Sequence, residues 1–372
     1  MDFAFTEEQE AVRELAARIC GDLSTPERLK EIEAGDERID RKLWKELADA
    51  GLLGIGLPEA VGGAGLGLTA AGIVAEEVGR AAAAVPYAAA LSAAGAIAEL
   101  GSDALVDRWM AGILAGDTLV TGALVEAGAL PDQPATTATR AADGWRLEGA
   151  KTCVPAGLAA DALVLSAAVA DGGVGLFVVP TTAAGITRRR QEATSGALEA
   201  EVELGGVLVG DEDTLVTGEG GAEALGRLLE ATSAAICLEI AGACQAAVKL
   251  TASYTSEREQ FGKPIASFQA VGQRAADAFI DAEAVRLTAW QAVWRLAEGL
   301  PATAEVAVAK YWADEGAQRC VHAAQHLHGG VGVDREYPLH RFFLRVKHLA
   351  PTLGGTTPSL LRLGDILAEE PA

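Results

Sequence analysis

Basic residues are scarce in this chain of 372 residues: 30 Lys and Arg stand against 52 Asp and Glu, which gives a formal charge of −22 at pH 7. A protein that binds nucleic acid needs a basic face to displace counterions from the phosphates. Docking on an anionic membrane surface also requires clustered positive charge. The composition therefore argues against both kinds of partner.

Cysteines are also few. The five cysteines Cys20, Cys153, Cys237, Cys244 and Cys320 form no C-x-x-C pair. This spacing argues against a disulfide scaffold, a zinc site and a thioredoxin-type site. We expect separate reduced thiols.

The sequence also lacks a targeting segment. Its start, MDFAFTEEQE, is acidic and has no basic segment followed by an apolar one, as a signal peptide would. No apolar run free of polar residues reaches the roughly 20 residues that span a bilayer. We therefore expect a soluble protein of the cytoplasm, with no membrane insertion.

Motifs of several enzyme classes are missing. The chain has no G-x-S-x-G elbow, no Walker A loop and no G-x-G-x-x-G between a strand and a helix. His322 and His326 have a helical spacing that can bind zinc, and His328 follows, but no H-E-x-x-H motif occurs. We expect no metal, and a packing or cofactor-edge role for these histidines.

Apolar residues, by contrast, make up 50% of the chain, enough for two or three domains with buried cores. Thr6 and Gln9 have the spacing of a capping box and predict the start of a helix. Further helices are predicted in alanine-rich or proline-free stretches, at 68–83, 86–115, 221–257, 266–298 and 303–328. Short β-prone runs predict antiparallel strands, at 144–149, 162–166, 174–179 and 201–204. Strands segregated between helical regions indicate an α+β fold.

One stretch carries groups suited to a nucleotide. It reads YTSEREQFGKPI at 254–265 and is followed by SFQAV at 267–271. A predicted helix ends at Gly262, and the loop carries Arg258, Gln260 and Phe261 together. A guanidinium suits paired phosphate oxygens, and an adjacent ring can stack on a base. The alternative is a solvated helix end with one buried Phe.

The order of these residues resembles the acyl-CoA dehydrogenase family. Two other stretches match in the same order: LPEAVGGAGLG at 57–67, and LHGGVGV at 327–333 with EYP and RFFLRVK after it. The resemblance extends over nearly the whole chain. It implies an N-terminal helical domain at 1–116, a middle antiparallel β domain at 117–215, and a C-terminal four-helix bundle of long helices at 216–372.

The resemblance also implies FAD, held across a subunit interface. In the family, the neighbouring subunit holds part of the adenosine and pyrophosphate end. The matching residues here are Arg258, Gln260, Phe261, Gln269, His326, Gly329 and Gly330. His326 stands where the family usually has Gln, and an imidazole can still stack on or hydrogen-bond a nucleotide.

The catalytic carboxylate of the family is missing at its usual positions. Most members place a Glu in a Tyr-Glu-Gly-Thr stretch, which falls here on Leu353 or Gly354. Others place it on the helix before the Arg-x-Gln-Phe loop, which falls on Thr232. Glu230 is the nearest candidate, but two residues along a helix turn it about 200° from the required face.

The segments that face the flavin also depart from the family pattern. The usual Thr-Glu-Pro-x-x-Gly-Ser-Asp reads VEAGALPD at 125–132, so two hydroxyls are lost. The usual Trp-Ile-Thr reads CVP at 153–155, so a ring and another hydroxyl are lost. Pro131 also removes a backbone N–H. The chain's own flavin site is therefore eroded, while the half lent to a neighbour is largely kept.

This asymmetry resembles the subunit without catalytic Glu of heterotetrameric (α2β2) dehydrogenases that act on steroid side chains. The implied partners are a homologous base-containing subunit, an acyl-CoA substrate and an electron-transfer acceptor reached through that subunit. Two alternatives stay open. One is a self-sufficient homotetramer that uses Glu230, placed by a local helix irregularity. The other is a non-redox protein for acyl-thioester binding or assembly.

Overall fold

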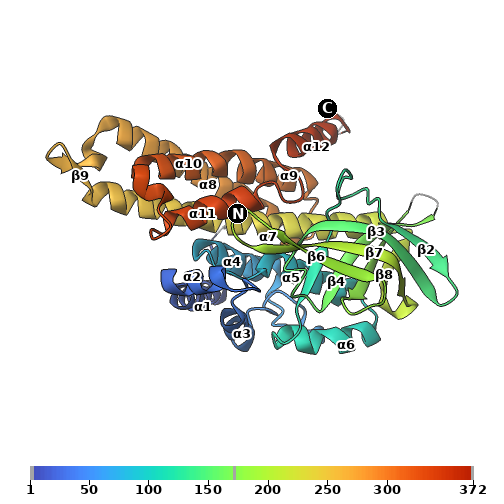
Figure 1. The fold of residues 1–372 in the computed structure, drawn as a ribbon. Helices are drawn as coiled ribbons and strands as arrows, with labels where there is room; N and C mark the ends of the chain where they lie inside the picture. The colour runs from blue at the N-terminus through green and yellow to red at the C-terminus, as the bar shows by residue number, and fades with distance from the viewer. Residues whose placement is uncertain (1–3, 171–172, 370–372) are drawn as a thin grey trace. The chain divides into compact units, whose positions relative to one another are not determined.

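The computed structural model describes residues 4–170 and 173–369 (Figure 1). Its α-helices are α1 (Glu7–Leu23), α2 (Pro26–Ala34), α3 (Arg41–Asp49), α4 (Gly67–Arg80), α5 (Tyr87–Leu100), α6 (Asp103–Leu114), α7 (Gly221–Glu257), α8 (Gln269–Ala297), α9 (Thr303–Tyr311), α10 (Ala317–His328), α11 (Leu339–Leu349) and α12 (Thr356–Glu369). Its strands are β1 (Val120–Ala123), β2 (Thr137–Ala141), β3 (Gly144–Pro155), β4 (Ala162–Ala168), β5 (Val174–Pro180), β6 (Ile186–Glu192), β7 (Leu198–Val209), β8 (Thr214–Gly218), β9 (Glu259–Gln260) and β10 (Lys263–Pro264). The outer ends of the first and last predicted domains, 1–3 and 370–372, lie outside the described residues.

The first helix begins where the sequence predicts. The Thr6 hydroxyl accepts a hydrogen bond from the Gln9 N–H at 3.2 Å, and the Gln9 side-chain oxygen accepts one from the Thr6 N–H at 3.0 Å. The two bonds satisfy donors that a helix start otherwise leaves unpaired. The predicted capping box is confirmed.

Each of two predicted long helices forms two shorter helices in the structure. The stretch 86–115 forms α5 and α6, because the chain is extended at Gly101 and the Ser102 hydroxyl caps a new helix at Leu105 N–H, 3.3 Å away. The stretch 303–328 forms α9 and α10, joined by a π-helical turn, η5 (Trp312–Gly316). Such a turn widens a helix without ending it, and a Cβ added at its last residue, Gly316, would lie 2.7 Å from the Trp312 ring.

The packing groups the chain into two compact units. The first contains residues 1–30, 72–83 and 233–372, and the second contains residues 31–71 and 84–232. Both α4 and α7 therefore contribute to the two units. The boundaries of the three domains expected from the sequence stay a prediction.

The second unit is built on an eight-stranded sheet with the order β6-β7-β3-β2-β4-β5-β8, and β1 pairs with β4. Its ladders are antiparallel except for the pairings of β1 and β2 with β4, which are parallel and make the sheet mixed. Strand β8 follows the acidic 210–213 stretch and closes one edge beside β5. Alternating side chains of β3, β4, β5 and β7 fill one core, which includes fully buried Leu147, Leu163 and Phe177.

In the first unit, α4 and α7 approach so closely that only glycine fits at the contact. A Cβ added at Gly79 would lie 1.8 Å from the carbonyl oxygen of Glu239, and one at Gly242 would lie 1.9 Å from that of Glu76. The Glu76 carboxylate accepts hydrogen bonds from the Trp290 indole at 3.1 Å and from a guanidinium on α8. Helices α8 and α10 lie side by side in the same unit (Figure 1).

Helix α7 is, within the described ranges, the one helix long and apolar enough to cross a bilayer. However, 78% of its most apolar window is buried inside the protein, as in the core helix of a folded domain. The helix is α-helical without interruption from Gly221 to Glu257.

Candidate functional site

The predicted Arg-x-Gln-Phe loop is a short hairpin at the end of α7. The Arg258 N–H donates to the Tyr254 carbonyl at 2.8 Å and closes the helix, and the Ile265 N–H returns to the Arg258 carbonyl at 2.8 Å. Between these bonds, β9 pairs with β10 in an antiparallel ladder. The two residues at the tip are Phe261, with φ of +56°, and Gly262, with φ of +77°. The helix ends at Glu257, earlier than the predicted Gly262.

Phe261 is both exposed and conformationally costly. Its surface is 92% exposed, and its ring packs against the Phe268 ring in a T-shaped arrangement, with centroids 6.1 Å apart. Positive φ at both tip residues is the type I′ pattern, which Asn-Gly prefers because a Cβ crowds the left-handed backbone. The alternative of one buried Phe in this loop is therefore wrong. A strained, exposed aromatic side chain is a signature of a binding site.

The Gly-Gly turn follows α10. Gly329 has φ of +59° and ψ of −137°, a conformation that only glycine adopts readily. Gly330 has no such constraint, and a Cβ added there would meet nothing within 4 Å. Nothing in the chain's own packing therefore requires glycine at 330, which suits the close approach of a molecule from outside the chain.

Aromatic packing ties this turn to the hairpin. The Tyr254 ring stacks on the His328 ring with centroids 4.4 Å apart. The His328 Nδ1 lies 2.8 Å from the Ala324 carbonyl, which only accepts, so Nδ1 carries the proton and Nε2 accepts from the Tyr337 hydroxyl at 3.2 Å. Burial lowers the pKa of His328, which keeps the ring neutral. No local sequence pattern predicts the stack of Tyr254 on His328, because the two residues lie far apart in the chain.

All of the predicted cofactor-binding residues belong to the first unit and are exposed. Gln269 is the first residue of α8, directly after Phe268, and His326 lies in the last turn of α10. The full set is Arg258, Gln260, Phe261, Gln269, His326, Gly329 and Gly330. Guanidinium, amide, aromatic ring and glycine turn together have the chemistry to bind a nucleotide diphosphate.

The loop after α11, where most relatives would carry the base, holds no carboxylate. Leu353 has φ of +60° and is half-buried, and Gly354 follows it. The loop is fixed by the buried amine of Lys310, which donates to the carbonyls of Ala350 and Thr352 at 2.8 Å each. Burial lowers the pKa of Lys310. The loop is therefore rigidly anchored but offers no group that could accept a proton from a thioester.

The second base position lies on α7. The hydroxyl of Thr232 donates to the Leu228 carbonyl at 2.7 Å, one turn back along the helix. The proton of this hydroxyl is therefore already used in a hydrogen bond to the backbone. Glu230 is half-buried on the same helix. Because α7 is continuous, the irregularity that would turn Glu230 to the face of Thr232 is not present in it. That part of the homotetramer hypothesis is wrong.

Through Glu126, the segment 125–132 is hydrogen-bonded and ion-paired to other residues of the β-sheet unit. The Glu126 carboxylate accepts hydrogen bonds from the N–H groups of Ala135 at 2.8 Å and Thr136 at 2.9 Å, and it pairs with the buried Lys151 ammonium. Lys151 also donates to the Ser166 hydroxyl at 3.2 Å. Burial alone raises the pKa of Glu126, but Lys151 and the donors of Thr136 outweigh burial, and the pKa is lowered.

The second segment predicted to face the flavin, 153–155, is hydrogen-bonded to a glutamine that was not predicted from the sequence. Gln191 on β6 accepts the Cys153 N–H at 2.8 Å and donates to the Thr152 hydroxyl at 3.0 Å. Cys153 is exposed, at an irregularity of β3, with φ of +50°. Burial, and then the charge of Glu199, raise the pKa of its thiol. With Pro155 lacking an N–H, this segment offers a flavin few donors and does not fit one.

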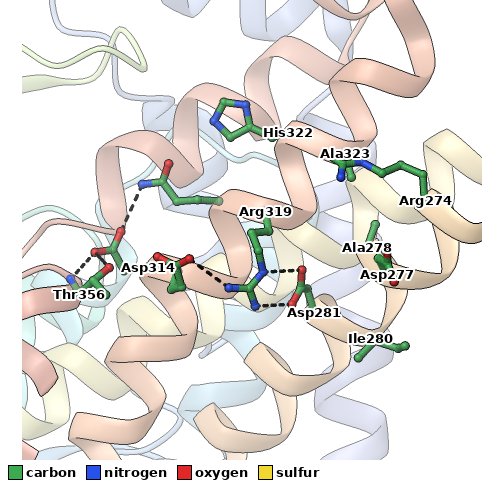
Figure 2. Close-up of a pocket in the computed structure, with 12 residues that line it drawn as sticks. Arg274, Asp277, Ala278, Ile280, Asp281, Asp314, Arg319, His322, Ala323 and Thr356 are labelled. Atoms are coloured by element: carbon green, nitrogen blue, oxygen red, sulfur yellow. Dashed lines mark hydrogen bonds and ion pairs between the residues drawn. The ribbon is translucent and has the colours of Figure 1, made fainter.

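A pocket of about 730 Å³ opens between α8, η5, α10 and the start of α12 (Figure 2). Several of its charged groups have partners within the lining: Arg319 pairs with Asp281 and with Glu315, and Asp314 accepts from the Thr356 hydroxyl at 2.7 Å. None of the predicted cofactor-binding residues lines it. Such a charge-paired lining does not suit an acyl chain.

The three histidines do not converge on one point. His322 lines the pocket of Figure 2, and its ring meets Phe343 edge-on with centroids 4.9 Å apart. Burial, and then Lys347 and Arg274, lower the pKa of His322. Across residues 4–170 and 173–369, no group of three or more His, Cys, Asp or Glu side chains is arranged to hold a metal ion. All five cysteines are free thiols, four of them buried.

Comparisons with known proteins show the family of the chain. Two family models match: "Acyl-CoA dehydrogenase, N-terminal domain" over residues 6–117 and "Acyl-CoA dehydrogenase, C-terminal domain" over residues 218–364. Acyl-CoA dehydrogenase FadE27 of Mycobacterium tuberculosis is 40% identical over 382 residues, covering 100% of both chains.

Solved structures show the same fold. A chain of the ChsE4-ChsE5 complex from Mycobacterium tuberculosis is 38% identical with a TM-score of 0.94, covering 100% of both chains. A chain of a variant Tcur3481-Tcur3483 steroid ACAD is 43% identical with a TM-score of 0.92, covering 98% of both chains. The predicted fold class, with helices before and after a central sheet, is confirmed, and FAD is the cofactor of this family. The chain therefore belongs to the acyl-CoA dehydrogenase family, oxidoreductases that act on CH–CH bonds.

Proposed function

We propose that this chain is the base-lacking subunit of a flavin-dependent acyl-CoA dehydrogenase complex. A related chain carries the catalytic carboxylate and faces the flavin. This chain lends it the exposed residues of the hairpin and the Gly-Gly turn, which bind the adenosine and pyrophosphate end of FAD. The proposed complex oxidises an acyl-CoA thioester in the cytoplasm and passes electrons to an acceptor through the partner.

The observation that carries this proposal is the contrast between the two half-sites. In the lent half, Phe261 is 92% exposed on a strained backbone, and Gly330 faces open space. Neither feature stabilises the chain itself. In the chain's own half, the Cys153 N–H already donates to Gln191, in the segment that the family resemblance places against the flavin. A surface site that includes a strained backbone and exposed residues suits a ligand that is bound jointly with another chain.

The roles of this chain's residues follow from their chemistry. Arg258 presents five donors in a planar fork that matches phosphate oxygens. Phe261 offers a flat apolar face for an adenine, and Gly329 and Gly330 let the backbone approach the ligand closely. When bound, FAD supplies the acceptor for the hydride that leaves the thioester. Proton removal falls to the partner, because Leu353, Gly354 and Thr232 have no carboxylate.

The identity of the partner and substrate rests on the solved relatives. One of them is a chain of the ChsE4-ChsE5 complex, and another is a chain of a steroid ACAD. We extend both properties to this chain: a base-containing homologue as partner, and a thioester of a bulky steroid-type acid as substrate.

The test is co-expression with a base-containing relative from the same genome. We expect the chain alone to be colourless, and the mixture to purify as one assembly with bound flavin and dehydrogenase activity. A lone chain that binds FAD and oxidises an acyl-CoA would overturn the proposal.

A pair of glycine variants sharpens this test. Gly330→Ala should lower the flavin content of the mixture without destabilising the lone chain, because the added methyl group meets only the ligand. Gly95→Ala on α5 is the matched control, since a Cβ there also meets nothing within 4 Å. Equal flavin content in the two variants would contradict the assignment of the Gly-Gly turn.

A further inference from the structure

The hairpin at the end of α7 carries a cation to which no role has been given. Lys263 pairs directly with Gln260 in the antiparallel register, across the tip formed by Phe261 and Gly262. Residues directly opposite each other in such a pair project from the same face of the ladder. Lys263 and Gln260 therefore present their side chains on one side of the hairpin.

The ammonium of Lys263 lies over an aromatic ring. Its Nζ is 4.5 Å from the centroid of the Phe268 ring, and that ring forms a T-shaped contact with Phe261. Within the part of the chain that the structure describes, neither Lys263 nor Arg258 forms an ion pair with a carboxylate. A cation over a ring is held by a weak interaction and stays available for a stronger anion.

We propose that Lys263 is a second cation of the nucleotide site that this chain lends, and that it binds the diphosphate together with Arg258. The inference rests on the proposed function and deepens it. A diphosphate bridge carries two negative charges, and the single guanidinium of Arg258 neutralises only one of them. Lys263 supplies a mobile point charge beside the rigid fork of Arg258. On binding, its ammonium moves from the face of Phe268 to a phosphate oxygen, and the ring is released to contact the nucleoside.

Two ligands of the complex contain a diphosphate, FAD and the CoA thioester. We assign Lys263 to FAD because it shares one hairpin with Gln260 and Phe261, which the family resemblance places on FAD. The CoA diphosphate is the competing source, and the experiment distinguishes the two.

The experiment uses the co-expressed complex, stripped of flavin and titrated with FAD. We expect Lys263→Gln to weaken FAD binding by about tenfold or more, as for loss of a charged hydrogen bond. Lys263→Arg should retain most of the affinity, and the salt dependence of FAD binding should become shallower in Lys263→Gln. FMN, which lacks the diphosphate, should bind both forms equally. Lys249→Gln is the matched control, since Lys249 is exposed on α7 outside the hairpin.

Three results would overturn the inference. One is an FAD affinity of Lys263→Gln equal to that of the unmodified complex, which leaves the proposed function standing. Another is a loss of acyl-CoA affinity with FAD binding intact, which assigns the lysine to CoA. The third is a complex that binds no FAD at all, which removes the proposed function and this inference together.

Discussion

The buried pair of Glu126 and Lys151 offers a quantitative test of what holds the β-sheet unit together. Both side chains are nearly inaccessible, and each has further partners: two N–H donors for Glu126 and the Ser166 hydroxyl for Lys151. Lys151→Met removes the cation and leaves a buried carboxylate with only neutral donors. Glu126→Gln removes the anion, and its amide oxygen can still accept from the two N–H groups.

The expected magnitudes follow from this geometry. Breaking a buried pair from one side typically costs about 3–5 kcal/mol, because the remaining charge is uncompensated. We expect Lys151→Met to lower the free energy of unfolding by an amount within this range. We expect Glu126→Gln to lower it by an amount near the lower end of the range. The double variant Glu126→Gln/Lys151→Met should be far less destabilised than the sum of the single ones, since it leaves no isolated charge.

The pair should also make the stability of the sheet depend on pH. The pKa of Glu126 is lower in the folded chain than its ordinary value, so its stabilisation is fully present above the unfolded pKa of about 4.3. It is lost as the pH falls through the lower folded pKa. In Lys151→Met the carboxylate lacks its cation, and the loss should begin at higher pH.

Hydrogen exchange of β3 and β4, followed by mass spectrometry, measures the opening free energy of this sheet locally. Arg140→Met is the control, because Arg140 pairs with Asp211 on the exposed surface and should change little. If Lys151→Met exchanges like Arg140→Met, or if the single effects simply add in the double variant, the reasoning about uncompensated charge is refuted.

Three further predictions concern other parts of the chain. Gly79→Ala should strongly destabilise the chain in urea unfolding, since the added Cβ would lie 1.8 Å from the Glu239 carbonyl oxygen; an unchanged midpoint would contradict the close contact of α4 and α7. Phe261→Asn should leave the lone chain at least as stable, because Asn tolerates a φ of +56°, yet lower the flavin content of the complex; a clear loss of stability would show that the ring serves the chain itself. In native protein, a thiol reagent should label Cys153 alone among the five cysteines, with the rate rising above neutral pH because the pKa of this thiol is raised; mass spectrometry of the labelled peptides decides the point.

Local signals in the sequence predicted local structure well. The capping box of Thr6 and Gln9 and the long helix α7 are read from spacing and the absence of proline, and both are found. The break at Gly101 and Ser102 was missed, although Ser before an apolar run is a helix-start signal, because alanine on both sides masked it. The π-helical turn η5 has no such signal, because it arises from packing.

The candidate site also combines residues that local motifs predict with contacts that they do not predict. The residues of the hairpin and the Gly-Gly turn lie in short motifs, so the sequence alone predicted them as candidates. Their supports, such as the stack of Tyr254 on His328, join distant segments and became visible only in the fold. Gln191 binding at Cys153 is another such contact, made across neighbouring parts of the sheet unit.

Because Gly330 faces open space, the structure predicts which codons of the gene would change most readily during evolution. Folding exerts no purifying pressure on it, since an alanine there would meet no atom of the chain. Under the proposed function, only the fitness of an organism that expresses both this gene and the partner's gene preserves it. In a lineage that lost the second gene, this codon and that of Phe261 should be among the first to drift, well before the buried glycines of the α4–α7 contact.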